Sequence, residues 1–420
     1  MTTPSASSSR PADAGFAAAA TLVAAVVFLF GWAILHRGFF ADRPIVDTPV
    51  YEHYGSAIDS GYVPYRDFAV EYPPGALPVF VAPALGGARG DTYRRRFEGL
   101  MAFLGVVTLF SVGLALVSLG AGRRWLLAAL GLAAVAPILL GPVVLSRFDL
   151  WPAALTAIAL AALVGDRFRW GHVALGAAVA AKLYAAVLVP VALIYVWRRR
   201  GRRDALICGG LLLAVVAIAF VPFLVVAPHG IWDSLWNQAS RPLQIESLGA
   251  GLLLVSHHVF GTGVTMESGH GSQNLAGTTA DTFAVVQSLL QISALAAIWI
   301  LFARGPATKT RLLYASAAAL VAFIALGKVL SPQFLVWAVA AVVLVQGTRG
   351  VLATGLVLVA CGLTRWWFPG MYWELVKQFD PQATWLVLIR DLVLLGVLAV
   401  LVARPLRGAV RSTAREPEPA

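Results

Sequence analysis

Charged residues are scarce in this sequence. Asp, Glu, Lys and Arg make up 13% of its 420 residues, whereas about 25% is usual in a soluble globular protein. Hydrophobic residues make up 59%. This balance excludes a water-soluble chain of several domains. It predicts one polytopic membrane unit, because a helix of about 20 apolar residues spans the hydrocarbon core of a bilayer.

Cysteine is almost absent as well. Cys208 and Cys361 both lie inside apolar runs, so we interpret them as buried small hydrophobes rather than as a disulfide, metal or redox site. The sequence also lacks a phosphate-binding Gly-rich loop, a Ser nucleophile elbow and a dinucleotide-binding fingerprint, which disfavours ATP and nucleotide-sugar chemistry. We expect no cofactor and no nucleic-acid partner, since the net charge of +11 is better explained by membrane orientation.

Apolar runs of bilayer length recur along the chain. The first, Phe16 to Leu35, is followed by His36, Arg37 and Gly38 rather than by a small-residue cleavage site, which favours a retained span over a removed signal peptide. We predict an all-α polytopic fold of about 11–13 transmembrane helices. Further spans are expected near residues 95–119, 125–145, 150–165, 204–226, 281–303, 311–326, 331–346, 350–364 and 382–403.

The stretch 171–196 does not fit a single crossing. The sequence GDRFRW precedes it and WRRRGRRD follows it, so one crossing would place a strongly basic loop outside. Two short helices that return to the same side remove the conflict. Lys182 then lies near the tip of this hairpin, which must pack against other helices or a wet cavity.

The charges also predict an orientation. With the N-terminus in the cytoplasm, more than half of the 32 Lys and Arg residues fall in inner loops and tails, and most of the 21 Asp and Glu residues fall outside. The basic bias is the established orientation signal. The outward excess of carboxylates indicates function on the outer face. We therefore predict a multi-pass protein of the cell membrane, with tails 1–15 and 404–420 in the cytoplasm and two long outer loops, 36–94 and 227–280.

The first outer loop has an unusual density of Asp, Glu, Arg and Tyr. The stretch TPVYEHYGSAIDSG suits a short interfacial helix with Tyr51, Tyr54 and Tyr62 at headgroup depth. The run YPPGALPVFVAPALGG is too short and too interrupted by proline for an ordinary span. We interpret it as a second juxtamembrane element.

This loop carries a recognisable pattern. Asp47 comes shortly after the first span, Tyr51 follows four residues later, then a Gly, PYRDF and EYPPGALP. The pattern resembles the family 87 glycosyltransferases of the GT-C superfamily, membrane enzymes that move a sugar from a polyprenyl-phosphate donor to an acceptor on the outer face. The hairpin and the later GKVLSPQFLVW segment are similar to the wider superfamily layout. The resemblance implies one GT-C transmembrane domain over residues 16–403, with the catalytic loop at 36–94.

Asp47 matches the position of the family's catalytic Asp. The resemblance implies that it is the general base for transfer with inversion at the anomeric carbon. The alternative is that Asp47 caps the helix that begins at Thr48 and Pro49.

Other residues of the loop are candidates for binding the donor or acceptor sugar. They are Tyr51, Arg66, Asp67 and Glu71. A simple ion pair between Arg66 and Asp67 explains those two residues at least as well.

Cations at membrane depth are candidates for the donor phosphate, because an intramembrane charge is costly and usually functional. Lys182, Lys328 and Arg147 fit this description. The alternatives are a salt bridge from Arg147 to Asp149 and a snorkelling Lys328 that reaches the headgroups. Arg390 and Asp391 are expected to form a structural pair in the last span.

The second outer loop mixes aromatic residues and amides with the apolar run LGAGLLLV. Trp232, Trp236 and Asn237 suit a sugar or isoprenoid groove, although a plain membrane anchor explains the tryptophans better. An aromatic belt likewise explains TRWWFPGMYW at 364–373. His257, His258 and His270 lack a carboxylate or Cys at metal-site spacing, so we predict no metal.

Together these features predict a membrane glycosyltransferase, with mannose the usual sugar of the family. Its partners are then a polyprenyl-phosphate sugar donor, a lipid-linked or cell-wall glycan acceptor, and the lipid bilayer. A lipid or glycolipid flippase is the alternative. A flippase is expected to carry paired discontinuous helices and ionisable residues in several spans, whereas this chain concentrates its outer charges in one loop. A non-enzymatic assembly subunit is a third possibility.

Overall fold

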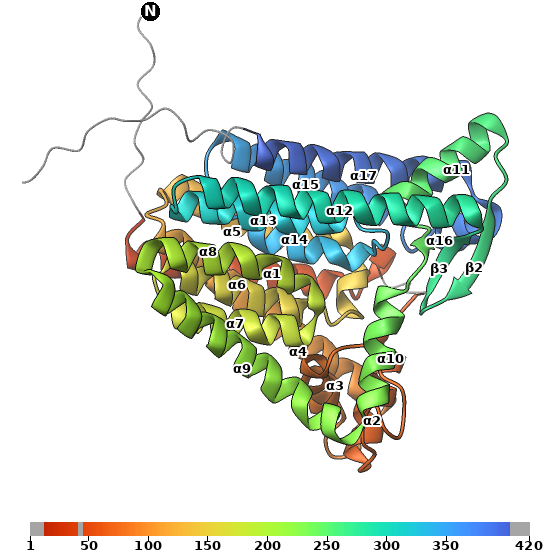
Figure 1. Cartoon of the computed structure of the whole chain (residues 1–420), viewed down its shortest axis with the longest axis horizontal. Helices are drawn as coiled ribbons and strands as arrows, with labels where there is room; N and C mark the ends of the chain where they lie inside the picture. Colours follow the sequence, from red (N-terminus) through yellow and green to blue (C-terminus); the bar gives the residue numbers. More distant parts are fainter. Residues whose placement is uncertain (1–11, 41–44, 404–420) are drawn as a thin grey trace, which may run out of the picture.

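The computed structural model describes residues 12–40 and 45–403, and these form a bundle of helices (Figure 1). Seven helices in this part of the chain are long and apolar enough to cross a membrane. The prediction of a multi-pass membrane protein is therefore confirmed. The seven are α1 (Ala14–Ile34), α4 (Gly90–Ser118), α5 (Arg123–Leu140), α9 (Arg202–Val226), α12 (Thr278–Arg304), α15 (Thr348–Trp367) and α17 (Pro381–Val402).

Shorter apolar helices fill the interior of the bundle. They are α6 (Leu150–Val164), α13 (Lys309–Ala325) and α14 (Leu335–Val342), the last preceded by the 3-10 turn η5 (Pro332–Phe334). Most residues of α6 and α13 are buried, and many are Ala, which lets neighbouring helices approach closely. By contrast, only 6% of the most apolar stretch of α9 is buried inside the protein. The side of α9 that the protein leaves uncovered suits contact with lipid.

The stretch 171–196 forms the hairpin that the charge pattern predicts. Its elements are α7 (Phe168–Ala181), the 3-10 helix η4 (Leu183–Leu188) and α8 (Val189–Arg200). The start of α7 and the end of α8 lie close together. Arg199 Nη2 is 3.5 Å from Asp166 Oδ1, and the Arg200 guanidinium lies 5.5 Å from the Phe168 ring centre. Lys182 adopts an extended backbone conformation that ends α7 at the tip.

The first loop contains both predicted juxtamembrane elements. Helix α2 (Thr48–Asp59) is followed by the turn η2 (Pro74–Ala76) and α3 (Leu77–Ala84). Gly55 permits close contact between α2 and α3, since a Cβ there would lie 2.1 Å from the Phe80 carbonyl oxygen. Tyr51 and Tyr54 are buried against neighbouring aromatic rings, whereas Tyr62 is exposed. The position of these tyrosines at headgroup depth stays a prediction.

The second loop contains elements that the sequence did not predict. Between α10 (Pro228–Ala239) and α12 lie α11 (Leu248–Phe260) and a small antiparallel sheet, with strand order β1-β3-β2. The strands are β1 (Leu243–Gln244), β2 (Thr265–Gly269) and β3 (Ser272–Ala276), and Leu275 pairs with both Leu243 and Met266. The remaining elements are the turns η1 (Gly38–Phe40) and η3 (Pro142–Leu145) and helix α16 (Tyr372–Gln378).

Candidate functional site

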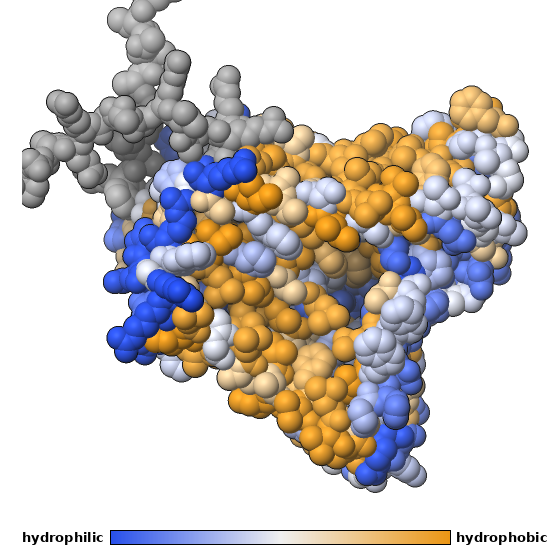
Figure 2. All heavy atoms as spheres, viewed as in Figure 1, coloured by the Kyte–Doolittle hydropathy of each residue, from blue (hydrophilic) through white to orange (hydrophobic). Residues whose placement is uncertain are grey.

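A cavity of about 480 Å³ lies where the first loop, the hairpin tip, the second loop and the GKVLSPQF segment meet. In the space-filling view the surface is hollowed here, with hydrophilic residues at the back and along the right side of the hollow and hydrophobic residues to its left (Figure 2). Six of the eight residues predicted to act as the base or to bind the sugar or the phosphate line this cavity. They are Asp47, Tyr51, Glu71, Arg147, Lys182 and Lys328.

Breaks in helices bring the buried charges to the cavity. Helix α5 ends at Leu140 because Gly141 has a φ of 84°, a conformation that favours glycine. The turn η3 follows, and the chain then passes through Arg147 and Asp149 before α6 begins at Leu150. The extended backbone at Lys182 does the same for the hairpin. Non-helical backbone at membrane depth is tolerated where it lines a cavity in this way.

Two ion pairs cross the cavity wall. Arg147 Nη1 contacts Asp47 Oδ2, and Lys182 Nζ lies 2.7 Å from Asp149 Oδ1. The alternative salt bridge from Arg147 to Asp149 is therefore wrong, because Asp149 serves Lys182 instead. Lys182 also lies over the rings of Phe148, at 4.5 Å from its centre, and Trp337, at 5.0 Å. These contacts stabilise a charge that is 16% exposed.

The side chain of Asp47 does not cap α2. Asp47 occupies the N-cap position, yet its carboxylate accepts no capping hydrogen bond. It instead contacts Arg147 and accepts a hydrogen bond from the Tyr51 hydroxyl at 3.3 Å, both through Oδ2. Tyr51 is itself fixed by a stacked ring contact with Phe80 at 4.6 Å. Tyr51 is thus better placed to position Asp47 than to bind a sugar face, while Asp47 is 28% exposed to the cavity.

Three cations of the cavity retain unused hydrogen-bonding capacity. Arg241 forms no ion pair among the described residues, and its Nε is buried without a hydrogen-bond partner. The Nε of Arg147 is likewise unpartnered. Lys328 donates a hydrogen bond to the Ala239 carbonyl oxygen at 3.2 Å rather than pairing with a carboxylate. These groups suit an anion. Arg241 was not among the predicted site residues, although it is the single Lys or Arg in the loop 227–280.

Glu246 is a buried carboxyl group at the back of the cavity, 2% exposed. Burial raises the pKa of Glu246 to about 8, against the opposing effect of the Arg390 and Arg147 charges. Arg390 Nη2 donates a hydrogen bond of 2.6 Å to the Glu246 carbonyl oxygen, and its Nε lies 2.6 Å from Asp391 Oδ1. The predicted pair of Arg390 and Asp391 is thus confirmed, and it supports the loop that carries Glu246.

Arg66 and Asp67 do not line the cavity. They form the simple ion pair that the sequence offered as an alternative, with Arg66 Nε 2.8 Å from Asp67 Oδ1. Asp67 also accepts a hydrogen bond from the Val63 amide at 2.7 Å. The Arg66 and Val63 hydrogen bonds lower the pKa of Asp67 to about 2. This pair stabilises a surface turn of the first loop.

The second loop and the TRWWFPGMYW segment supply further walls. The turn between β2 and β3 places His270 at the cavity, with its Nδ1 3.1 Å from the Asn237 carbonyl oxygen. Phe368 and Tyr372 also line the cavity, whereas the neighbouring Trp366 is exposed. A plain aromatic belt thus does not describe Phe368 and Tyr372, and for Trp366 it stays a prediction. In the described part of the chain, no three His, Cys, Asp or Glu side chains form a metal-binding group.

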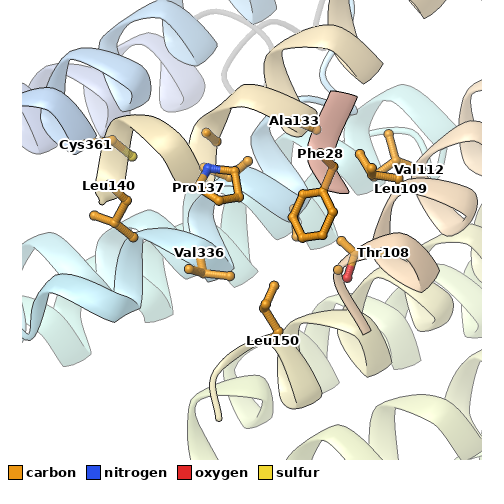
Figure 3. Close-up of a pocket in the computed structure, with 14 residues that line it drawn as sticks. Phe28, Thr108, Leu109, Val112, Ala133, Pro137, Leu140, Leu150, Val336 and Cys361 are labelled. Carbon is orange, nitrogen blue, oxygen red and sulfur yellow. The ribbon is translucent and has the colours of Figure 1, made fainter. Parts of the chain in front are cut away.

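A second pocket, of about 40 Å³, differs in character (Figure 3). Phe28, Leu109, Pro137 and Val336 line it, and its walls are almost wholly apolar. Cys361 lies beside it as a buried free thiol, as the sequence predicted. Without charged groups, this pocket is unsuited to binding a sugar or a phosphate.

No protein-family model and no curated protein matches this chain. The chemistry of the large cavity and the pattern of the first loop are therefore the basis for assigning a function.

Proposed function

We propose that this protein is an inverting membrane glycosyltransferase with a GT-C type fold. It transfers a sugar, with mannose the first choice, from a polyprenyl-phosphate donor to a lipid-linked or cell-wall glycan on the extracytoplasmic face. The observation that carries the proposal is the meeting of Asp47 with several cations in one cavity. The cavity volume of about 480 Å³ falls within the range of about 300–1,000 Å³ that is usual for small-molecule sites.

Asp47 is the proposed general base. Its Oδ2 is engaged by Arg147 and Tyr51, and no hydrogen bond from the described residues reaches Oδ1. In the proposed step, Oδ1 takes the proton of the acceptor hydroxyl while that hydroxyl oxygen bonds to the anomeric carbon. The bond between the anomeric carbon and the phosphate oxygen breaks, and its electron pair leaves with the polyprenyl phosphate.

The phosphate that leaves requires positive charge. Arg241 and Lys328 are proposed to hold it, because both line the cavity and neither forms an ion pair with a described carboxylate. The unpartnered Nε of Arg147 is placed to assist. Lys182 contributes less, since Asp149 already neutralises it. Cations that are fixed before the reaction stabilise the developing charge without reorganisation.

The sugar is proposed to lie between these groups. Glu71 lines the cavity, and its backbone carbonyl oxygen accepts a hydrogen bond of 3.1 Å from Gln238 Nε2, which joins the first loop to α10. The carboxylate of Glu71 is proposed to accept a hydrogen bond from a sugar hydroxyl. Tyr372 and Phe368 offer aromatic faces in the same cavity.

The proposal is tested by measuring sugar transfer with purified protein, polyprenyl-phosphate mannose and candidate glycolipid acceptors. We expect Asp47→Asn to lower the turnover by about 10²–10⁴-fold, the usual contribution of a general base. Asp67→Asn is the matched control, because Asp67 is an ion-paired carboxylate of the same loop outside the cavity. Equal transfer by the wild type and Asp47→Asn excludes Asp47 as the base. Lipid movement across vesicles without any transfer favours the flippase instead.

A further inference from the structure

A further hollow, of about 320 Å³ and lined by several charged residues, lies at the other end of the bundle from the cavity. Helix α6 separates the two, running from Leu150 beside the cavity to Val164, a length of about 22 Å. Arg167, Arg169 and Arg200 line the hollow. The space-filling view shows deep-blue residues gathered at this end, directly beside hydrophobic surface (Figure 2).

The arginines of the hollow are not neutralised within the protein. The Asp166 carboxylate is occupied by Lys309 at 2.8 Å and Arg199 at 3.5 Å. Among the described residues, Arg167, Arg169 and Arg200 form no ion pair. Asp204 is the other carboxylate at the hollow. Three guanidinium groups against this one remaining carboxylate leave a net positive site.

Helix ends reinforce this positive charge. Helices α7 and α9 both begin at the hollow, and neither has a side-chain cap on its first-turn amides. The free amides at the start of a helix carry partial positive charge. They add to the arginines rather than replace them.

The surroundings of the hollow fit a lipid rather than a soluble anion. Trp170 and Trp197 are 70% and 59% exposed near the arginines, as is usual for indoles at a membrane interface. Further along α9, Leu206 and Leu213 are about two-thirds exposed, at 64% and 65%. A charged hollow therefore lies directly above an apolar wall that suits acyl chains.

We propose that this hollow binds the headgroup of an anionic phospholipid. Its phosphate lies among Arg167, Arg169 and Arg200, and its acyl chains lie along the exposed side of α9. The site is independent of the proposed transferase activity, because α6 separates it from the cavity.

The test is native mass spectrometry of the purified protein titrated with phosphatidylglycerol, with phosphatidylcholine and inorganic phosphate as comparison ligands. The variant Arg167→Gln/Arg169→Gln removes two charges of the hollow. We expect it to weaken phosphatidylglycerol binding about 30-fold, since each basic group near a headgroup contributes about a fivefold factor. The control Arg123→Gln/Arg124→Gln removes two adjacent charges at the start of α5, outside the hollow.

Selective weakening in the first variant, with the control close to wild type, supports the site. Equal weakening in both variants would show that only diffuse charge attracts the lipid, which overturns the proposal. Inorganic phosphate that displaces the lipid at matched concentration overturns it as well, because the site would then bind a soluble anion. Thermal unfolding without lipid checks that both variants fold, as expected for exposed arginines.

Discussion

The ion pair between Asp149 and Lys182 allows a quantitative test of the buried electrostatics. Asp149 is 2% exposed and Lys182 is 16% exposed, and their charged atoms lie 2.7 Å apart. Removing one partner of a buried pair leaves the other charge uncompensated and costs about 3–5 kcal/mol. Because Lys182 keeps its contact with the Phe148 ring, we expect Asp149→Leu to lower the free energy of unfolding by about 3 kcal/mol, the lower end of this range.

The double variant Asp149→Leu/Lys182→Met removes both charges and is expected to recover most of this loss. Well-packed hydrophobic residues often replace a buried ion pair without loss of stability. Reversible unfolding in mixed detergent micelles measures both variants. The matched control is Asp91→Leu on α4, whose pair with Arg94 is exposed at 73% and 46% and contributes at most about 1 kcal/mol. A double variant less stable than Asp149→Leu alone would show that the uncompensated charge of Lys182 is not the source of the lost stability.

Three further predictions follow from single residues. Arg241→Gln is expected to raise the KM for a polyprenyl-phosphate donor by about 10–100-fold, because a charged hydrogen bond to the phosphate is lost. Initial-rate kinetics measure this KM, and an unchanged value contradicts the prediction. Because burial raises the pKa of Glu246 to about 8, folding favours its protonated form, so its stabilising effect is complete below about pH 4.5 and is lost as the pH rises towards 8. The thermal unfolding temperature of Glu246→Gln is then expected to fall less between about pH 4.5 and 8 than that of the wild type. Parallel plots of unfolding temperature against pH for the two proteins would exclude the effect. Gly55→Ala places a Cβ 2.1 Å from the Phe80 carbonyl oxygen and is expected to cost about 1–3 kcal/mol, whereas Gly99→Ala meets no atom within 4 Å and is expected to be neutral in the same unfolding assay.

Much of the helical framework follows from the sequence, because bilayer-length apolar runs have few alternatives. Even the hairpin was predictable, since the basic residues at both its ends favour one side of the membrane. The contact between Arg199 and Asp166, which joins the two ends of the hairpin, fits this expectation. The apolar runs thus predict the long helices, although not α10 and α11 of the second loop.

Pairing between distant segments was not predictable. Asp149 lies two residues from Arg147 in sequence, yet the turn after Gly141 directs Arg147 to Asp47 and leaves Asp149 to Lys182. Sequence proximity therefore suggested the wrong partner. The same limit explains why the small β-sheet was missed, because its strands have at most five residues each.

Arg241 is the residue of the site that sequence analysis had the means to find. A single basic residue in an outer loop of more than fifty residues is conspicuous once the loops are assigned. Its role depends on contacts from the first loop and from the segment after α13, which only the folded chain brings together.

In the proposed mechanism, the large cavity holds a polyprenyl-phosphate sugar between Asp47 and the cations Arg241 and Lys328. A density map of the protein with bound donor tests this claim most directly. We expect the phosphate within hydrogen-bonding distance of Arg241 and Lys328, with the anomeric carbon facing the side of the cavity that carries Asp47. A donor whose phosphate lies outside this cavity, or whose sugar points away from Asp47, would contradict it.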